Sequence, residues 1–157
     1  MNQKEIIIQL TECDRSQLDT PDRELLLVAE EMTRQAYAPY SNFCVGAAIR
    51  LDNGQVVKGN NQENVAFPSG TCAERSAAFY AGANFPKAKF ETIAVAARES
   101  GGDFPEEPIS PCGACRQALL EFEKRAGRPV RVILGGKDKV YILPSIASLL
   151  PLAFTEF

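Results

Sequence analysis

The stretch Cys72-Ala73-Glu74, together with the later stretch Pro111-Cys112-Gly113-Ala114-Cys115, determines how this chain is interpreted. The two stretches offer three cysteine sulfurs as ligands for a tetrahedral metal ion, and they leave the Glu74 carboxylate unligated. A catalytic zinc site differs from a closed structural site by having such an open fourth position. The pattern therefore predicts metal-assisted hydrolysis.

The spacing of the sulfurs predicts that each stretch begins a helix. Residues at i and i+2 of a helix point in nearly opposite directions, so Cys72 and Glu74 share a pocket only if Cys72 sits at the helix entry. Cys112 and Cys115 are one turn apart on one face of a later helix, and Pro111 marks its start. All three sulfurs are thus expected at positive helix ends.

The negative charge of three thiolates predicts an arginine beside the metal. Three thiolates around Zn²⁺ leave a net negative charge, which weakens the ion's ability to acidify a bound water. Arg75 is the expected guanidinium that tunes the zinc site by offsetting this charge, with Arg116 as a second candidate. The chain has no histidine, so another side chain must transfer protons, and Glu74 already lies in the motif.

Length, charge and cysteine content limit the classes of protein to consider. The chain has 157 residues, so we expect a single domain over residues 1–157, with 1–19 as an N-terminal extension. A net charge of -3 gives no general attraction to nucleic acid or membranes. With neither a secretory signal nor a long apolar run, the expected location is the cytoplasm. Five cysteines there fit metal or catalytic use better than disulfides.

Alternating helix and strand signals predict an α/β fold, namely a three-layer α/β/α domain with a five-stranded mixed sheet. A helix capped by Thr20 is expected to run to about Tyr37, and a hairpin is expected around the turn at residues 52–54. The first 19 residues fit a short strand, a helix or a tail. The other expected elements are helices from Cys72 to Ala83 and from Cys112 to Lys124, strands at 91–97, 131–134 and 140–143, and a short helix at 145–150.

The chain also resembles a known family, the small homotetrameric cytidine deaminases that bind zinc through three cysteines. The resemblance covers most of residues 37–154, and its motifs follow the family's order. The matching runs are Tyr37-Ala38-Pro39-Tyr40-Ser41-Asn42-Phe43-x-Val45-Gly46-Ala47-Ala48, Gly59-Asn60-Asn61-Gln62-Glu63-Asn64, Thr71-Cys72-Ala73-Glu74-Arg75-Ser76-Ala77, Ser110-Pro111-Cys112-Gly113-Ala114-Cys115-Arg116-Gln117 and Leu149-Leu150-Pro151-Leu152-Ala153-Phe154.

The resemblance implies a specific reaction. Zinc is held by Cys72, Cys112 and Cys115, and its bound water, deprotonated by Glu74, attacks C4 of cytosine. Glu74 then delivers protons to N3 and to the departing amine. Cytidine and deoxycytidine would give uridine and deoxyuridine with ammonia, a reaction of pyrimidine salvage.

The resemblance also assigns substrate contacts. Asn61 and Glu63 match the pair that hydrogen-bonds the ribose hydroxyl, the Ala73 backbone N–H matches a contact to the base carbonyl, and Phe43 matches a ring packed against the base. Phe154 corresponds to an aromatic side chain that reaches the active site from a neighbouring subunit. The implied partners are a small nucleoside and other copies of the chain in a homotetramer with shared active sites. Neither a nucleic acid polymer nor a membrane is expected.

Two other functions stay open. A deaminase of the same fold that acts on another aminated heterocycle, such as an aminonucleoside antibiotic or guanine, would share the zinc and Glu74 but would not require the ribose pair. The cysteines could instead form a structural zinc site with Cys44 or Cys13 as fourth ligand, or a redox pair of Cys112 and Cys115. The redox alternative leaves the stretch at residues 72–74 unexplained.

Overall fold

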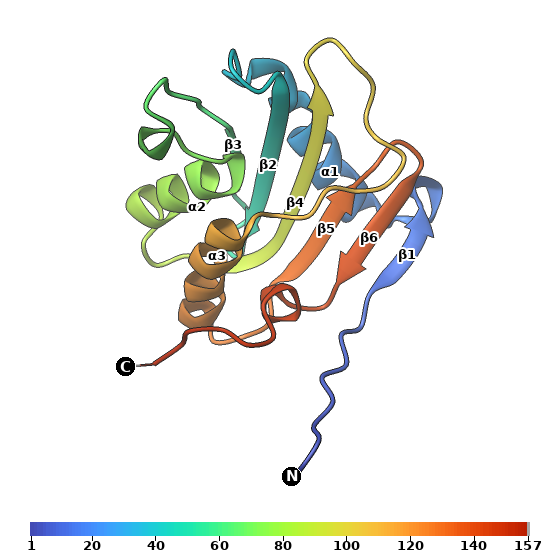
Figure 1. Ribbon diagram of the computed structural model, residues 1–157, viewed down its shortest axis with the longest axis vertical. Helices are drawn as coiled ribbons and strands as arrows, with labels where there is room; N and C mark the ends of the chain where they lie inside the picture. The colour runs from blue at the N-terminus through green and yellow to red at the C-terminus, as the bar shows by residue number, and fades with distance from the viewer. Residues whose placement is uncertain (157) are drawn as a thin grey trace.

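A computed structural model describes residues 1–156, so the last residue of the expected 1–157 domain lies outside the described range. One sheet has the strand order β1-β6-β5-β4-β2-β3 (Figure 1). Its strands are β1 Thr11–Asp14, β2 Phe43–Leu51, β3 Val56–Asn60, β4 Phe90–Glu99, β5 Arg131–Gly135 and β6 Lys139–Leu143. Strands β4 and β5 are parallel and the other neighbours antiparallel, so the predicted mixed sheet is confirmed. Within residues 1–156, no helix has the length and apolar character needed to cross a bilayer.

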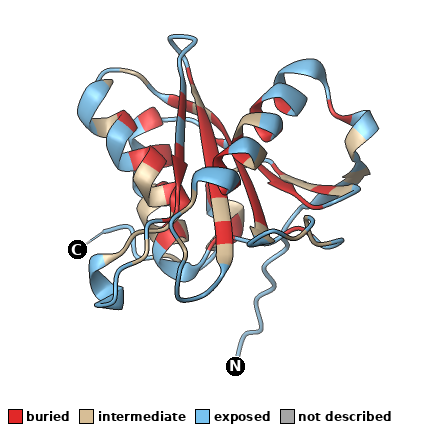
Figure 2. Ribbon diagram, turned by 90° about the horizontal axis from the view of Figure 1, so that it is seen from above, coloured by how far each residue is buried: buried red, intermediate tan, exposed pale blue. Residues whose placement is uncertain are grey.

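Helices cover both faces of the sheet. Helix α1 (Thr20–Met32) packs on one face, and α2 (Ala73–Asn84) and α3 (Gly113–Ala126) pack together on the other (Figure 1). Figure 2 shows that buried residues concentrate in the strands and on the helix surfaces that face them. Each face has its own apolar cluster. The predicted three-layer α/β/α arrangement is therefore confirmed.

The predicted number of strands is wrong, because the sheet has six. The additional strand is β1, whose Thr11 lies opposite Ile142 and whose Asp14 lies opposite Lys139 of β6. This strand is held by backbone pairing at the sheet edge, and its side chains are mostly exposed. Such an edge strand has no hydrophobic alternation, so periodicity alone does not reveal it.

Two helix ends also differ from the prediction. Asp19, not Thr20, caps α1, because its carboxylate accepts a hydrogen bond from the Asp22 backbone N–H at 2.9 Å. After Met32 the chain tightens into a short 3₁₀ helix, η2 (Thr33–Gln35). The helix expected at residues 145–150 is likewise a 3₁₀ helix, η4 (Ile146–Leu149).

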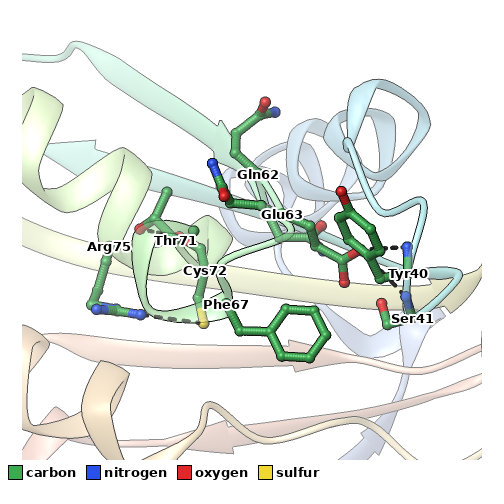
Figure 3. A pocket seen from close by; sticks show the side chains of 11 residues that line it. Tyr40, Ser41, Gln62, Glu63, Phe67, Thr71, Cys72 and Arg75 are labelled. Carbon is green, nitrogen blue, oxygen red and sulfur yellow. Dashed lines mark hydrogen bonds between the residues drawn. The ribbon is translucent and has the colours of Figure 1, made fainter.

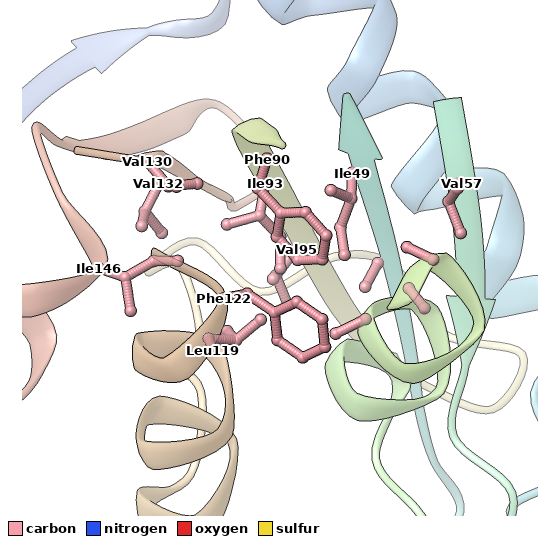
Figure 4. Close-up of a cluster of buried hydrophobic side chains, with 14 of the residues drawn as sticks. Ile49, Val57, Phe90, Ile93, Val95, Leu119, Phe122, Val130, Val132 and Ile146 are labelled. Carbon is pink, nitrogen blue, oxygen red and sulfur yellow. The ribbon is translucent and has the colours of Figure 1, made fainter. Parts of the chain in front are cut away.

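The larger core cluster fixes α2 and α3 against the sheet (Figure 4). The Phe90 ring of β4 stacks on the Phe122 ring of α3, with centroids 4.6 Å apart and planes 7° from parallel. Branched side chains of the central strands, such as Ile49 and Ile93, fill the space beneath α2 and α3. Since both helices pack on one face and contact each other, the two predicted metal-binding stretches lie at neighbouring helix starts.

A glycine permits the close approach of α2 to strand β3. A Cβ atom at Gly59 would lie 2.6 Å from the backbone nitrogen of Ala77 and 2.8 Å from the backbone oxygen of Ala73. Both are backbone atoms of α2, so they cannot turn aside as the end of a side chain can. Gly59 thus sets the distance between β3 and the first turns of α2, which include Glu74.

We expect Gly59→Ala to lower the free energy of unfolding by about 1–3 kcal/mol, because the added methyl group overpacks the α2–β3 contact. Chemical denaturation measures this change. Gly113→Ala is the matched control, since a Cβ at this first residue of α3 has no atom within 4 Å. The control is expected to stay within about 1 kcal/mol of the wild type, and equal losses in both variants would contradict the proposed packing role.

Candidate active site

The three predicted sulfur ligands meet at the N-termini of two helices. Cys72 is the N-cap of α2, Cys112 is the N-cap of α3, and Cys115 lies in the first turn of α3. Their Sγ atoms all lie within 4.8 Å of one another, and those of Cys72 and Cys112 are 4.0 Å apart. A tetrahedral zinc ion with Zn–S bonds of about 2.3 Å holds sulfur atoms about 3.8 Å apart. The cluster therefore has the size and the ligand type that zinc requires.

The remaining two cysteines lie outside this cluster. Cys44 is buried in β2, and Cys13 lies in β1 at the sheet edge. In the described part of the chain, the group of side chains able to hold a metal contains only Cys72, Cys112 and Cys115. The geometry therefore leaves room for a fourth ligand that is not a cysteine, which is the arrangement of a catalytic zinc site.

The surroundings of the cluster favour a negative charge on sulfur. The Cys115 thiol, Arg75 and Cys112 lower the pKa of Cys72 to about 5 through hydrogen bonds. Arg75 Nη2 lies 3.7 Å from Cys72 Sγ (Figure 3). The hydrogen bond to Cys72, together with burial, raises the pKa of Cys115. Cys72 is thus the more acidic thiol of the pair, and a thiolate is the form of cysteine that binds a metal cation.

Glu74 lies beside the sulfur cluster without joining it. Its side chain is on the first turn of α2 and the residue is only 4% exposed. Burial, and then the nearby Cys72 charge, raise the pKa of Glu74 above its ordinary value. A raised pKa makes a carboxyl group hold a proton more readily than an exposed one does, which suits a group that must both accept and donate protons.

The two arginines of the motif have different surroundings. Arg75 contacts Cys72, as expected for a residue that offsets the thiolate charge. Arg116, the second candidate for that role, instead donates hydrogen bonds to two backbone carbonyls, those of Pro111 and Leu149. Of the two arginines, Arg75 is therefore the one whose guanidinium lies beside the Cys72 sulfur.

A cavity of about 370 Å³ opens beside Cys72 (Figure 3). Its volume is within the range of ligand pockets. The wall combines aromatic rings, amides, hydroxyls and both signs of charge, so it can contact a flat ring and a polar group together. The lining residues are Tyr40, Ser41, Asn61, Gln62, Glu63, Asn64, Phe67, Gly70, Thr71, Cys72 and Arg75.

Glu63, a predicted ribose contact, lines this cavity as a fixed acceptor. Its Oε2 atom accepts hydrogen bonds from the backbone N–H groups of Tyr40, at 2.9 Å, and Ser41, at 3.3 Å. The Ser41 hydroxyl and these backbone groups lower the pKa of Glu63. The carboxylate is consequently ionised at neutral pH and able to accept a further hydrogen bond from a ligand hydroxyl.

Asn61, the other predicted ribose contact, also lines the cavity, but its amide already makes two hydrogen bonds. Oδ1 accepts from the Val45 backbone N–H and Nδ2 donates to the Phe43 carbonyl, both at 2.8 Å. An amide has two N–H donors and two lone pairs, so one of each is left for a ligand. The bonds to β2 hold the amide in a single orientation.

Three other predicted contacts lie outside this cavity wall. Phe43 is half-buried at the start of β2, and Ala73 is buried at the first position of α2, where helix geometry leaves the backbone N–H unbonded within the helix. Phe154 is 66% exposed and lines a different cavity along α3, and its carbonyl accepts a hydrogen bond from Gln117. A single chain therefore does not bring Phe154 to the cavity beside Cys72.

Two aromatic residues of the cavity are not among the substrate contacts predicted from the sequence. The Tyr40 and Phe67 rings meet edge to face, with centroids 5.9 Å apart and planes at 70° (Figure 3). Tyr40 belongs to the first matching run, whereas Phe67 begins a short 3₁₀ helix, η3 (Phe67–Ser69), for which the sequence gives no periodic signal. Only the folded structure shows that the Phe67 ring meets the Tyr40 ring.

Comparison with known proteins identifies the family. The family described as "Cytidine and deoxycytidylate deaminase zinc-binding region" matches residues 19–128, which is most of the chain and includes all three cysteines of the cluster. The chain belongs to this deaminase family. Zinc is therefore the cofactor that the family and the cysteine cluster together indicate.

Individual relatives agree with the family assignment. A cytidine deaminase of Sporosarcina psychrophila is 37% identical over 135 residues, which cover 85% of this chain and 90% of the relative. The crystal structure of cytidine deaminase from Burkholderia pseudomallei has 38% sequence identity and a TM-score of 0.68, and the match covers 83% of this chain and 97% of that one. A blasticidin-S deaminase of Bacillus cereus is 32% identical over 138 residues, covering 86% of this chain and 93% of the relative.

Proposed function

We propose that this chain catalyses the zinc-dependent hydrolysis of cytidine and deoxycytidine to uridine, deoxyuridine and ammonia. The observation that carries the proposal is a buried carboxyl, Glu74, beside three cysteine sulfurs in a member of the cytidine and deoxycytidylate deaminase family. We further propose a role in pyrimidine salvage in the cytoplasm. The five free cysteines suit a reducing compartment.

Cys72, Cys112 and Cys115 would hold the zinc ion, whose chemical contribution is to lower the pKa of a bound water to near neutral. In the reaction, the water oxygen bonds to C4 of the cytosine ring, the C4–N bond breaks, and the amino group leaves as ammonia. Glu74 would take a proton from the water and pass it to N3, and would then take the proton of the new C4 hydroxyl and pass it to the leaving amine, which leaves C4 as a carbonyl. Arg75 reduces the excess negative charge of the sulfurs.

Four further residues would bind the nucleoside. Asn61 and Glu63 offer a donor and an acceptor in fixed positions to a ribose hydroxyl. The free backbone N–H of Ala73 would bind the base carbonyl at the positive end of α2, and Phe43 would pack against the base. Polar contacts would thus select the sugar while the sulfur cluster and Glu74 act on the base.

A second candidate substrate is an aminonucleoside antibiotic. The blasticidin-S deaminase of Bacillus cereus shares 32% identity across 86% of this chain, so the same scaffold accommodates a different aminated base derivative in that relative. The cytidine assignment is favoured because both Asn61 and Glu63 line the cavity beside Cys72.

Glu74→Gln is expected to lower kcat for cytidine by about 10²–10⁴-fold, because the amide cannot exchange protons between water, N3 and the amine. Loss of the cytosine absorbance measures the rate, and elemental analysis is expected to show unchanged zinc content, since Glu74 is no ligand. Glu121→Gln, on an exposed position of α3, is the matched control and should retain full activity.

If Glu74→Gln keeps its activity, or if it loses its zinc, Glu74 is not the proton-transferring group proposed here. The same assay decides between substrates: we expect the wild-type kcat/KM for cytidine to exceed that for blasticidin S. The opposite order would establish the antibiotic as the preferred substrate.

We also infer that the active form is a homotetramer in which Phe154 completes the site of a neighbouring subunit. In one chain Phe154 is exposed and held on α3 away from the cavity. Further exposed apolar residues, including Tyr37, Phe67 and Leu152, provide surface that association can cover.

Sedimentation velocity is expected to show a tetramer, and Phe154→Ala is expected to raise KM for cytidine because the base loses an apolar contact. Leu27→Ala, at an exposed position of α1, is the control for truncating an exposed apolar residue, and KM should be unchanged. A fully active monomer would refute the shared site.

A further inference from the structure

The C-terminal part of the chain is tied to the metal-binding helix α3 by a buried carboxylate that the proposed chemistry does not use. Glu123 is only 9% exposed, yet both of its oxygens accept hydrogen bonds. Three of the hydrogen-bond donors belong to residues 145–147, where η4 begins. The Glu123 carboxylate of α3 therefore holds the N-terminus of η4 in place. The donors are Val130 N at 2.8 Å, Ser145 Oγ at 2.7 Å, Ile146 N at 2.7 Å and Ala147 N at 3.1 Å.

Arg116 holds the other end of η4. Its Nη1 atom donates to the carbonyl of Leu149, the last residue of η4, at 2.8 Å. Its Nε atom donates to the carbonyl of Pro111 at 2.7 Å. Arg116 and Glu123 are two helical turns apart, so they lie on the same face of α3.

The Pro111 carbonyl belongs to the residue directly before the ligand Cys112. Pro111 is buried, whereas Cys112 is exposed and has little packing of its own to fix its sulfur. A guanidinium is a planar fork that holds two acceptors in a set geometry, and its charge strengthens both hydrogen bonds. The orientation of the Pro111 peptide, and with it the entry of the chain into Cys112, depends on the bond from Arg116.

We propose that Arg116 is a positioning residue that couples the docking of η4 to the placement of Cys112 in the sulfur cluster. This inference rests on the proposed zinc site. When η4 is docked, the Leu149 carbonyl holds the Arg116 guanidinium in place. The guanidinium in turn holds the Pro111 carbonyl, and this keeps Cys112 Sγ near the other two sulfur atoms. The coupling is reciprocal, so zinc binding also favours the docked η4.

The first test is zinc affinity, measured by competition with a chromophoric chelator. Arg116→Met is expected to weaken zinc binding by about 10–100-fold, the usual effect of removing a group that orients a metal ligand. Arg116→Lys is expected to fall between this variant and the wild type, because an ammonium lacks the fork. Arg125→Met is the matched control: Arg125 lies in the last turn of α3, with its guanidinium 4.9 Å from the Phe122 ring centre, and its loss should leave zinc affinity unchanged.

The second test is hydrogen exchange of the backbone amides of η4 and its C-cap, residues 146–150, with and without zinc. We expect zinc to slow this exchange in the wild type, and we expect the zinc effect to disappear in Arg116→Met. A purely structural role would lower the Tm of Arg116→Met while leaving its zinc affinity unchanged.

Several outcomes would overturn the coupling. The coupling is refuted if Arg116→Met binds zinc as tightly as the wild type does. If Arg116→Met fails to fold, wild-type zinc affinity in Arg116→Lys refutes it instead. It is also refuted if zinc does not change the exchange rate of the wild-type amides. If the wild type itself binds no zinc, the proposed function fails as well. If the wild type binds zinc and the Arg116 variants bind it equally tightly, the coupling alone fails.

Discussion

The convergence of two helix N-termini on one set of sulfur atoms is the constraint on which the rest of the structure depends. Three Sγ atoms within 4.8 Å would repel one another as thiolates, so the position needs positive charge. The starts of α2 and α3 supply it through their dipoles, and Arg75 adds a full charge. The core beneath the two helices serves this geometry, because it holds both on one face of the sheet.

The first turn of α2 gives Cys72 and Glu74 different surroundings although they are two residues apart. Cys72 ends the preceding extended segment and faces the other sulfurs, whereas Glu74 lies two residues on and is buried outside the cluster. Burying a carboxyl group disfavours its charged form, which raises its pKa and costs stability wherever it is ionised. That cost is consistent with selection for a proton-transferring group over one that only stabilises the fold.

The sequence predicts the parts of the protein that depend on local patterns. The i, i+2 and i, i+3 spacings correctly placed Cys72 and Cys112 at helix starts, and helix and strand periodicity predicted the three layers. For residues 1–19 a short strand is only one of three alternatives that the sequence leaves open, because backbone pairing with β6, rather than side-chain alternation, holds β1. The contact of Phe67 with Tyr40 and that of Arg116 with the Leu149 carbonyl join segments distant in the sequence, so no local pattern could indicate them.

X-ray absorption at the zinc edge of the purified protein tests the central claim most directly, because it counts the atoms bound to the metal. We expect three sulfur atoms at about 2.3 Å and one oxygen or nitrogen atom at about 2.0 Å, the coordination of an open catalytic site. Four sulfur atoms would contradict the account. That result would mean that a fourth cysteine, such as Cys44, closes the site and that the metal is structural.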